Sequence, residues 1–135
     1  MTQYDQPPYT IPPLRTAYIR PLIHTDLNAV MAIDRQSYPS PRPRLAYERE
    51  LKNNQMAKNF VIEWQNKDSL TILGIGGFWL LADEIHITTV AVNPDWRRLG
   101  LGEWLLVALI HAGQAAGGTV ATLEVRPSNK SAQAL

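Results

Sequence analysis

A strand, a glycine-containing turn and a strongly apolar helix follow one another at residues 84–116. The stretch EIHITTVAV is rich in β-branched residues and predicts a strand over 84–92. EWLLVALIHAGQAA predicts a helix over 103–116 that ends at a glycine pair, and TVATLEVRP predicts the next strand, over 119–127. Two strands joined through a helix form a parallel pair by a right-handed crossover. This unit therefore requires a sheet with a helix packed on its face.

The preceding residues predict the rest of an α/β domain. Strands are expected over 17–23, 59–65 and 70–82, helices over 24–38 and 44–54, and a final helix over 128–135. Asp83 and Glu84 fit a tight hairpin turn after the third strand. Three consecutive strands predict an antiparallel meander. The order β-α-α-β-β-β-α-β-α predicts a mixed sheet with helices on both faces, formed by residues 17–135.

Composition restricts the function. A net charge of +1 argues against a general nucleic-acid binder, and the absence of cysteine excludes thiol catalysis. The three histidines lack the spacing of metal ligands, so no metal is expected. Neither a membrane-length apolar run nor a signal-peptide layout is present, so we expect a cytoplasmic protein without a membrane partner. Residues 1–16, with four prolines among the first 13, predict a flexible extended arm.

The turn RRLGLG at 97–102 fits an anion site. Gly100 and Gly102 let the backbone approach a ligand closely, and the amides of 98–103 would face outward at a helix N-terminus. Arg97 and Arg98 would add cationic contacts, and a pyrophosphate is the natural guest. The alternative is a helix start whose glycines serve only the turn and whose arginines are solvated. Neither GxGxxG nor the phosphate-loop pattern is present, so the residues alone leave both open.

The string Arg97-Arg98-Leu99-Gly100-Leu101-Gly102 follows the R/Q-x-x-G-x-G/A motif of the GCN5-related N-acetyltransferases. With VAV before it and LEVRPSN after it, the chain resembles this family over roughly residues 18–135. It is most similar to the bacterial branch that acetylates the N-terminal alanine of a ribosomal protein. The resemblance implies acetyl-CoA as donor and a protein N-terminus as acceptor. The alternatives are a different amine, on a small molecule or a lysine, and a CoA-binding fragment with little activity.

The resemblance also implies site residues. The backbone of the VAV segment would bind the pantetheine arm, and the amides of 98–103 the pyrophosphate. Glu124 would be the catalytic base, although an ion pair with Arg126 also explains it. Asn129 would contact the cofactor, although asparagine is also a favoured helix N-cap residue. The residues assigned to the cofactor are Val90, Ala91, Val92, Arg97, Arg98, Leu99, Gly100, Leu101, Gly102, Glu103 and Asn129.

Two further expectations concern the acceptor and the leaving thiolate. Tyr38 and Pro39 lie in the segment that borders the acceptor groove in this family and could seat a peptide N-terminus, unless the segment is only a rigid connector. The family's general-acid tyrosine lies in an ALYxxLGF run, of which Ala134-Leu135 match the start. The chain ends there, before that tyrosine and the last two strands of the family's fold. We therefore expect weak or absent transfer from these 135 residues.

Overall fold

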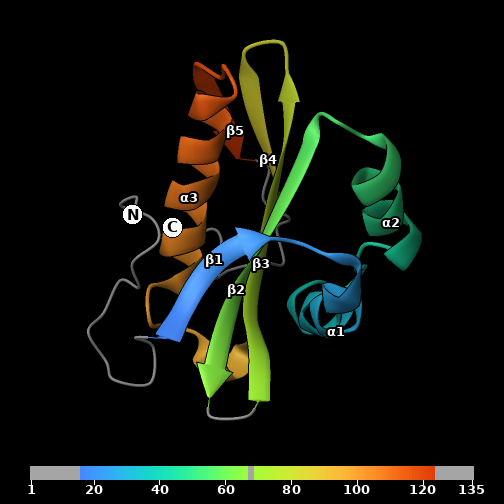
Figure 1. Ribbon diagram of the computed structural model, residues 1–135, viewed down its shortest axis with the longest axis vertical. Helices are drawn as coiled ribbons and strands as arrows, with labels where there is room; N and C mark the ends of the chain where they lie inside the picture. The colour runs from blue at the N-terminus through green and yellow to red at the C-terminus, as the bar shows by residue number, and fades with distance from the viewer. Residues whose placement is uncertain (1–15, 67–68, 124–135) are drawn as a thin grey trace.

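The computed structural model describes residues 16–66 and 69–123, which form a five-stranded sheet in the order β1-β2-β3-β4-β5 (Figure 1). The neighbours from β1 to β4 are antiparallel, and β4 and β5 are parallel. The expected mixed sheet, with its meander and crossover, is confirmed. The strands are β1 Ala17–Pro21, β2 Ala57–Asn66, β3 Ser69–Leu81, β4 Glu84–Val92 and β5 Val120–Leu123. The helices are α1 Leu27–Ser37, α2 Arg44–Asn53 and α3 Leu101–Ala115, with 3-10 turns η3 His24–Asp26 and η4 Pro94–Trp96.

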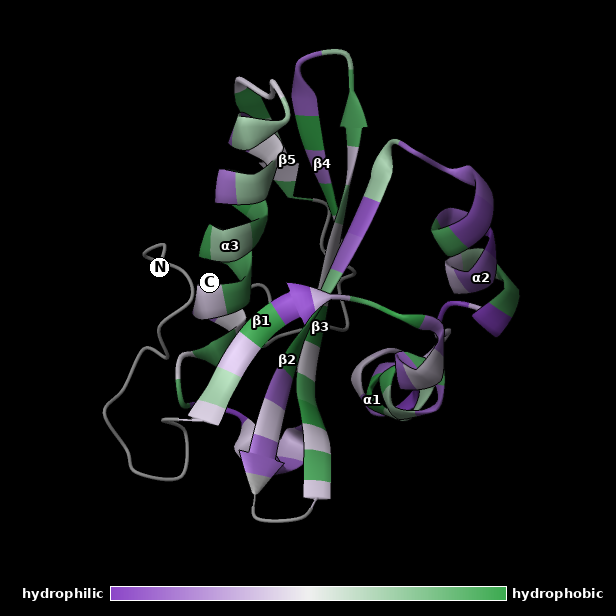
Figure 2. Ribbon diagram, viewed as in Figure 1, coloured by the Kyte–Doolittle hydropathy of each residue, from purple (hydrophilic) through white to green (hydrophobic). Residues whose placement is uncertain are grey.

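The helices cover both faces of the sheet, α3 on one side and α1 with α2 on the other (Figure 1). The apolar sequence of α3 fits its position, because its buried residues pack on the sheet (Figure 2). Each fully buried leucine, such as Leu105 or Leu109, contributes about 2 kcal/mol from burial. A second core cluster, which includes Leu27, Val30 and Ile75, fills the space between α1 and the other face. The more polar α2 packs at the margin, against α1 and β2.

A β-bulge interrupts β4 at Thr88. Ile87 pairs with Phe78 of β3, while Thr89 pairs with Gly77, so Thr88 is an extra residue in the ladder. Such a bulge bends its strand and disrupts pairing locally. On the other side of β4, β5 pairs with Glu84–Ile87. Within the described residues, the segment 88–92 therefore has a strand partner only on its β3 side.

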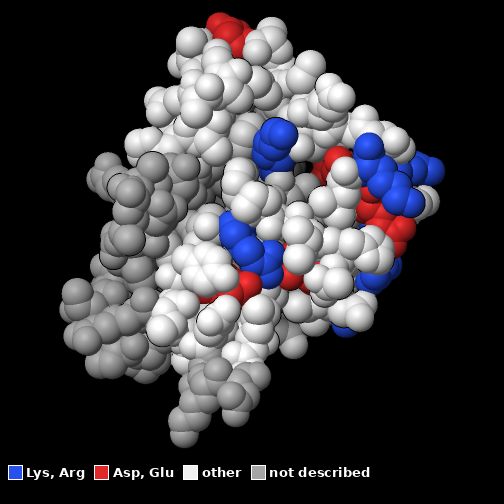
Figure 3. All heavy atoms as spheres, in the orientation of Figure 1, with Lys and Arg blue, Asp and Glu red and all other residues white. Residues whose placement is uncertain are grey.

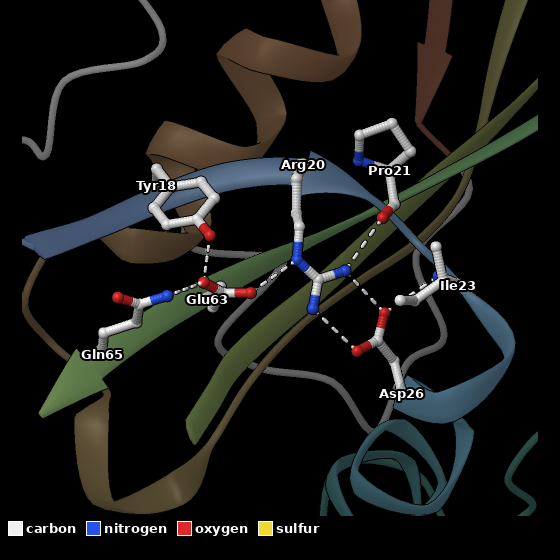
Figure 4. A network of polar contacts seen from close by, with 7 residues as sticks. All are labelled: Tyr18, Arg20, Pro21, Ile23, Asp26, Glu63 and Gln65. Carbon is white, nitrogen blue, oxygen red and sulfur yellow. Dashed lines mark hydrogen bonds and ion pairs between the residues drawn. The ribbon is translucent and has the colours of Figure 1, made fainter. Parts of the chain in front are cut away.

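A polar network fixes the start of α1 against the sheet (Figure 4). The Arg20 guanidinium donates to both carboxylate oxygens of Asp26, at 2.7 and 2.8 Å, and to Glu63 at 2.8 Å. Burial would raise the pKa of Asp26, but the hydrogen bonds from Arg20 and from the Ile23 amide outweigh it and hold that pKa below its usual range. The carboxylates are therefore ionised at neutral pH, and they connect β1, β2 and α1.

Several element boundaries differ from the expectation. The hairpin turn consists of Ala82 and Asp83, because Glu84 already pairs with Leu81 as the first residue of β4. The first strand ends at Pro21, and the turn η3 precedes α1. Thr16, expected in the N-terminal arm, donates a hydrogen bond to the Gln65 carbonyl at 2.8 Å and is held by β2. Residues 1–15 of that arm and the expected helix over 128–135 lie outside the described residues.

Candidate active site

The turn before α3 exposes the start of that helix. Arg98 and Gly100 have positive φ values of 66° and 77°, and α3 begins at Leu101, two residues earlier than expected. The first helical hydrogen bond runs from the Trp104 amide to the Gly100 carbonyl, at 3.0 Å. The amides of residues 101–103 consequently have no acceptor within the helix. Free amides and the positive end of the helix dipole together favour an anion at this point.

Hydrogen bonds and ring packing with neighbouring strands hold this turn in place. The Asn93 amide donates to the Leu73 carbonyl at 2.7 Å, and the Asn93 side chain accepts from the Asp95 amide at 3.1 Å. The Trp96 ring packs on that of Trp64 in β2, with centroids 4.7 Å apart and an interplanar angle of 57°. Trp96 therefore anchors the loop to β2 by packing. The helix start is therefore positioned independently of the arginine side chains.

The two arginines of the turn differ in their contacts. Arg97 donates from Nε to the Val92 carbonyl at 3.1 Å and from Nη2 to the Ser37 hydroxyl at 3.2 Å. Arg98 is exposed, and no described residue binds its guanidinium. Both side chains were expected at the rim of the anion site. Of the two, only the Arg98 guanidinium lacks a partner among residues 16–66 and 69–123.

The end of β4 lies between the two cores. The Val90 side chain packs in the cluster under α3, whereas Ala91 packs in the cluster under α1. Val92 is half-buried and joins the α3 side. Since no described strand pairs with 88–92 on the β5 side, the backbone there can accept an extended ligand as if it were another strand.

Tyr38 connects the end of α1 to this part of β4. Its side chain is buried, and its hydroxyl lies 3.3 Å from Thr89 Oγ1 and 3.4 Å from the Val90 carbonyl. Pro39 follows it at the surface. The Thr88 hydroxyl, at the bulge, is buried without a partner among the described residues. Of the two predicted acceptor residues, Tyr38 thus lies beside the strand expected to bind the cofactor, and Pro39 is its neighbour in the chain.

Glu124 and Asn129 lie outside the described residues. The last described residue of β5, Leu123, pairs with Ile87, directly before the bulge. Within residues 16–66 and 69–123, no three His, Cys, Asp or Glu side chains gather in a cluster that could bind a metal. In the same part of the chain, no helix has both the length and the apolar character needed to cross a bilayer.

A buried carboxylate next to the α1–α2 segment was not expected from the sequence. Glu50 of α2 pairs with Arg42 at 2.8 Å and accepts hydrogen bonds from Asn59, at 2.9 Å, and from the Trp79 indole. Burial would raise the pKa of Glu50, but these donors outweigh it and lower that pKa. Trp79 itself is 36% exposed. Figure 3 shows charged side chains gathered on the α2 side, and a separate acidic group at the top of the view. Only the tertiary structure brings these residues together, so no local signal could have found them.

Comparison with known proteins points to one family. A model of the acetyltransferase (GNAT) family matches residues 27–135. A Bacillus subtilis protein, provisionally named a [ribosomal protein bS18]-alanine N-acetyltransferase, is 33% identical over 119 residues, which cover 88% of this chain and 76% of the relative. The crystal structure of the ribosomal-protein-S18-alanine N-acetyltransferase from Escherichia coli has a TM-score of 0.71 at 30% identity, covering 87% of this chain and 72% of that one. An aminoglycoside N-acetyltransferase in complex with CoA shares the fold, with a TM-score of 0.69 at 18% identity over 87% of this chain and 82% of that one.

Proposed function

Because this chain belongs to the acetyltransferase (GNAT) family, we propose that it transfers the acetyl group of acetyl-CoA to the N-terminal alanine of ribosomal protein bS18. The observation that carries the proposal is the 33% identity, over 88% of the chain, to a relative named for that reaction. An acceptor on the ribosome would place the reaction in the cytoplasm. Acetyl-CoA supplies an activated acetyl group, and the chain's own residues bind it, orient it and move the proton.

The start of α3 fits the pyrophosphate of the donor. The amides of residues 101–103 would donate to its oxygens, and the left-handed backbone at Gly100 turns the chain so that they share one side. The exposed Arg98 would add a charge-assisted contact. The backbone of the other residues in 97–103 would form the turn that surrounds the pyrophosphate. These features make the turn a suitable binding site for the pyrophosphate of CoA.

The end of β4 would bind the pantetheine arm. The segment Val90–Val92 offers backbone groups on an edge that no described strand occupies, next to the bulge at Thr88. We assign the Val90 amide to the thioester oxygen, where a fixed donor stabilises the negative charge that develops during attack. Such a donor contributes about 3 kcal/mol in acyl transfer.

Glu124 is the proposed base and Asn129 a proposed cofactor contact. An N-terminal amine has a pKa of about 8, so a carboxylate near it can remove the proton that blocks attack at neutral pH. Glu124 is the residue after Leu123, which pairs with β4 directly before the bulge. The acceptor would arrive along the segment that begins with Tyr38 and Pro39, whose contacts with β4 support this direction of approach.

Calorimetry with acetyl-CoA tests the donor half of the proposal. Wild type should bind, and Gly100→Asp should not, because it places a carboxylate against the pyrophosphate in a strained conformation. Gly117→Asp is the matched control, since Gly117 also has a positive φ, of 107°, and lies beyond the other end of α3 with open space around its Cβ position. The donor assignment would be wrong if wild type failed to bind, or if both variants bound as wild type does.

An acceptor screen tests the other half. At the low rate expected of these 135 residues, peptides that begin with Ala should be acetylated on the α-amine, whereas the same peptides with a blocked N-terminus and a free lysine should not. Preferential acetylation of the lysine, or of a small-molecule amine, would contradict the protein N-terminus as acceptor and leave the donor assignment intact.

A further inference from the structure

Arg97 belongs to the proposed donor turn but contacts other elements. Its Nε donates to the carbonyl of Val92, the last residue of β4, and its Nη2 reaches the hydroxyl of Ser37, the last residue of α1. We infer that Arg97 is a positioning residue for the acceptor, which holds the α1–α2 segment against β4, rather than a ligand of the pyrophosphate. This inference rests on the proposed function and refines it.

The hydrogen bonds at Ser37 favour this geometry. The Ser37 hydroxyl donates its proton to the Ile33 carbonyl at 2.8 Å, so its oxygen lone pairs remain to accept from Arg97 at 3.2 Å. Arg97 is half-buried, and its planar guanidinium can satisfy two acceptors at fixed angles. A lysine in its place could keep the charge but not both bonds.

A second contact between the end of α1 and β4 lies one residue further along the chain. Tyr38 contacts Thr89 and the Val90 carbonyl, while Ser37 is joined through Arg97 to Val92. Two consecutive residues at the end of α1 therefore contact the last part of β4, one directly and one through Arg97. The segment 39–43 leaves from these two anchors, so its distance from β4 depends on them.

The donor turn does not depend on the same bonds. Asn93 and Trp96 fix that turn through Leu73 and Trp64, and its proposed pyrophosphate ligands are backbone amides. Loss of the Arg97 side chain should therefore disturb the acceptor more than the donor. A shift of about 1 Å between an acceptor amine and the acyl carbon can cost about 100-fold in rate.

Binding of two probes separates donor from acceptor effects. The first probe is CoA, and the second is CoA joined through an acetyl bridge to the α-amine of a tetrapeptide that begins with Ala. For Arg97→Ala we expect a Kd for CoA within about twofold of wild type and an affinity for the conjugate lowered about tenfold. Peptide acetylation should show a lower kcat/KM for the peptide, with an unchanged KM for acetyl-CoA. Arg97→Lys should behave as Arg97→Ala does.

Arg98→Ala is the matched control, and we expect it to weaken both probes by the same factor, with a reduced dependence on salt. Ser37→Ala should reproduce part of the loss of affinity for the conjugate that Arg97→Ala causes. The double variant should bind the conjugate no more weakly than Arg97→Ala alone, because both substitutions break the same contact. Ser37→Ala also keeps the inference testable if Arg97→Ala fails to fold.

Equal weakening of CoA and the conjugate by Arg97→Ala would make Arg97 a donor ligand and overturn the inference, with the proposed function intact. Wild-type behaviour of both Arg97→Ala and Ser37→Ala toward the conjugate would also overturn it. Failure of the wild type to bind CoA at all would instead refute the proposed function.

Discussion

The Tyr47 hydroxyl of α2 donates a 2.7 Å hydrogen bond to Oδ2 of Asp34 in α1, and both side chains are buried. Burial raises the pKa of Tyr47, and the negative charge of Asp34 raises it further, so the phenol remains a donor throughout the physiological range. Tyr47 also lies under the Arg42 guanidinium, whose carbon is 4.6 Å from the ring centroid. These contacts join α1, α2 and the segment between them on one face of the sheet.

Replacing Tyr47 by Phe should lower the free energy of unfolding by about 2 kcal/mol, because a buried carboxylate loses one of its donors. Urea denaturation measures the loss. Tyr18→Phe is the control. Its side chain is 38% exposed, and the Glu63 carboxylate that its hydroxyl binds keeps hydrogen bonds from Arg20 and Gln65, so we expect a smaller loss, of about 0.5–1 kcal/mol. Equal losses in the two variants would contradict the importance of the buried pair.

Glu50→Gln should lower the free energy of unfolding by about 3 kcal/mol at pH 7, because it leaves the Arg42 guanidinium without its buried counter-charge. Glu48→Gln, on the same helix, removes only an i,i+4 pair with Arg44 and should cost less than about 0.5 kcal/mol. Thermal unfolding of both variants gives the comparison. A similar small loss in both would show that Glu50 is solvated in solution.

Acid should destabilise the wild type by protonating its buried carboxylates. The pKa values of Asp26, Glu50 and Glu63 are lowered in the folded chain, mainly because hydrogen bonds from their partners outweigh the effect of burial. As the pH falls below about 4, the unfolded chain binds protons before the folded chain does, so the stability present at higher pH is lost. The free energy of unfolding, followed from pH 7 to 3, should fall less steeply in Glu50→Gln. A parallel fall in the two proteins would contradict a lowered pKa for Glu50.

The two glycines of the turn should respond differently to substitution. Gly100 has a φ of 77°, so Gly100→Ala should cost about 1 kcal/mol of stability and move the amides proposed to bind the pyrophosphate. Gly102 lies within α3 and has no positive φ, so Gly102→Ala should be neutral or slightly stabilising for the helix. Calorimetry should show at least about tenfold weaker acetyl-CoA binding for Gly100→Ala than for Gly102→Ala. The reverse order would contradict the assigned roles.

The sequence predicted each α-helix and strand that the structure describes, but not the 3-10 turns η3 and η4. The apolar pattern matches the buried face in α1 and α3, whereas α2 buries only Tyr47 and Glu50 and β5 is largely exposed. The bulge at Thr88 was not predicted, since one extra residue in TTVAV leaves the composition of the strand unchanged. Arg97 and Arg98 are adjacent and chemically identical, so only their contacts, 60 residues away in one case, distinguish them. Glu50 resembled a solvated helix residue because its donors come from Arg42, Asn59 and Trp79.

Glu124→Gln should retain acetyl-CoA binding but lower the rate of peptide acetylation at pH 7 by about 100-fold, because the α-amine loses its base. The deficit should shrink as the pH rises above about 8, where the amine deprotonates without help. Glu84→Gln is the control, because Glu84 accepts from Thr122 on β5 and pairs with His86 at 3.3 Å, with no proposed part in proton transfer. If Glu124 instead forms only an ion pair with Arg126, then Glu124→Gln and Arg126→Gln should lower stability alike and leave the pH–rate profile in place. A profile for Glu124→Gln parallel to that of the wild type would exclude Glu124 as the base.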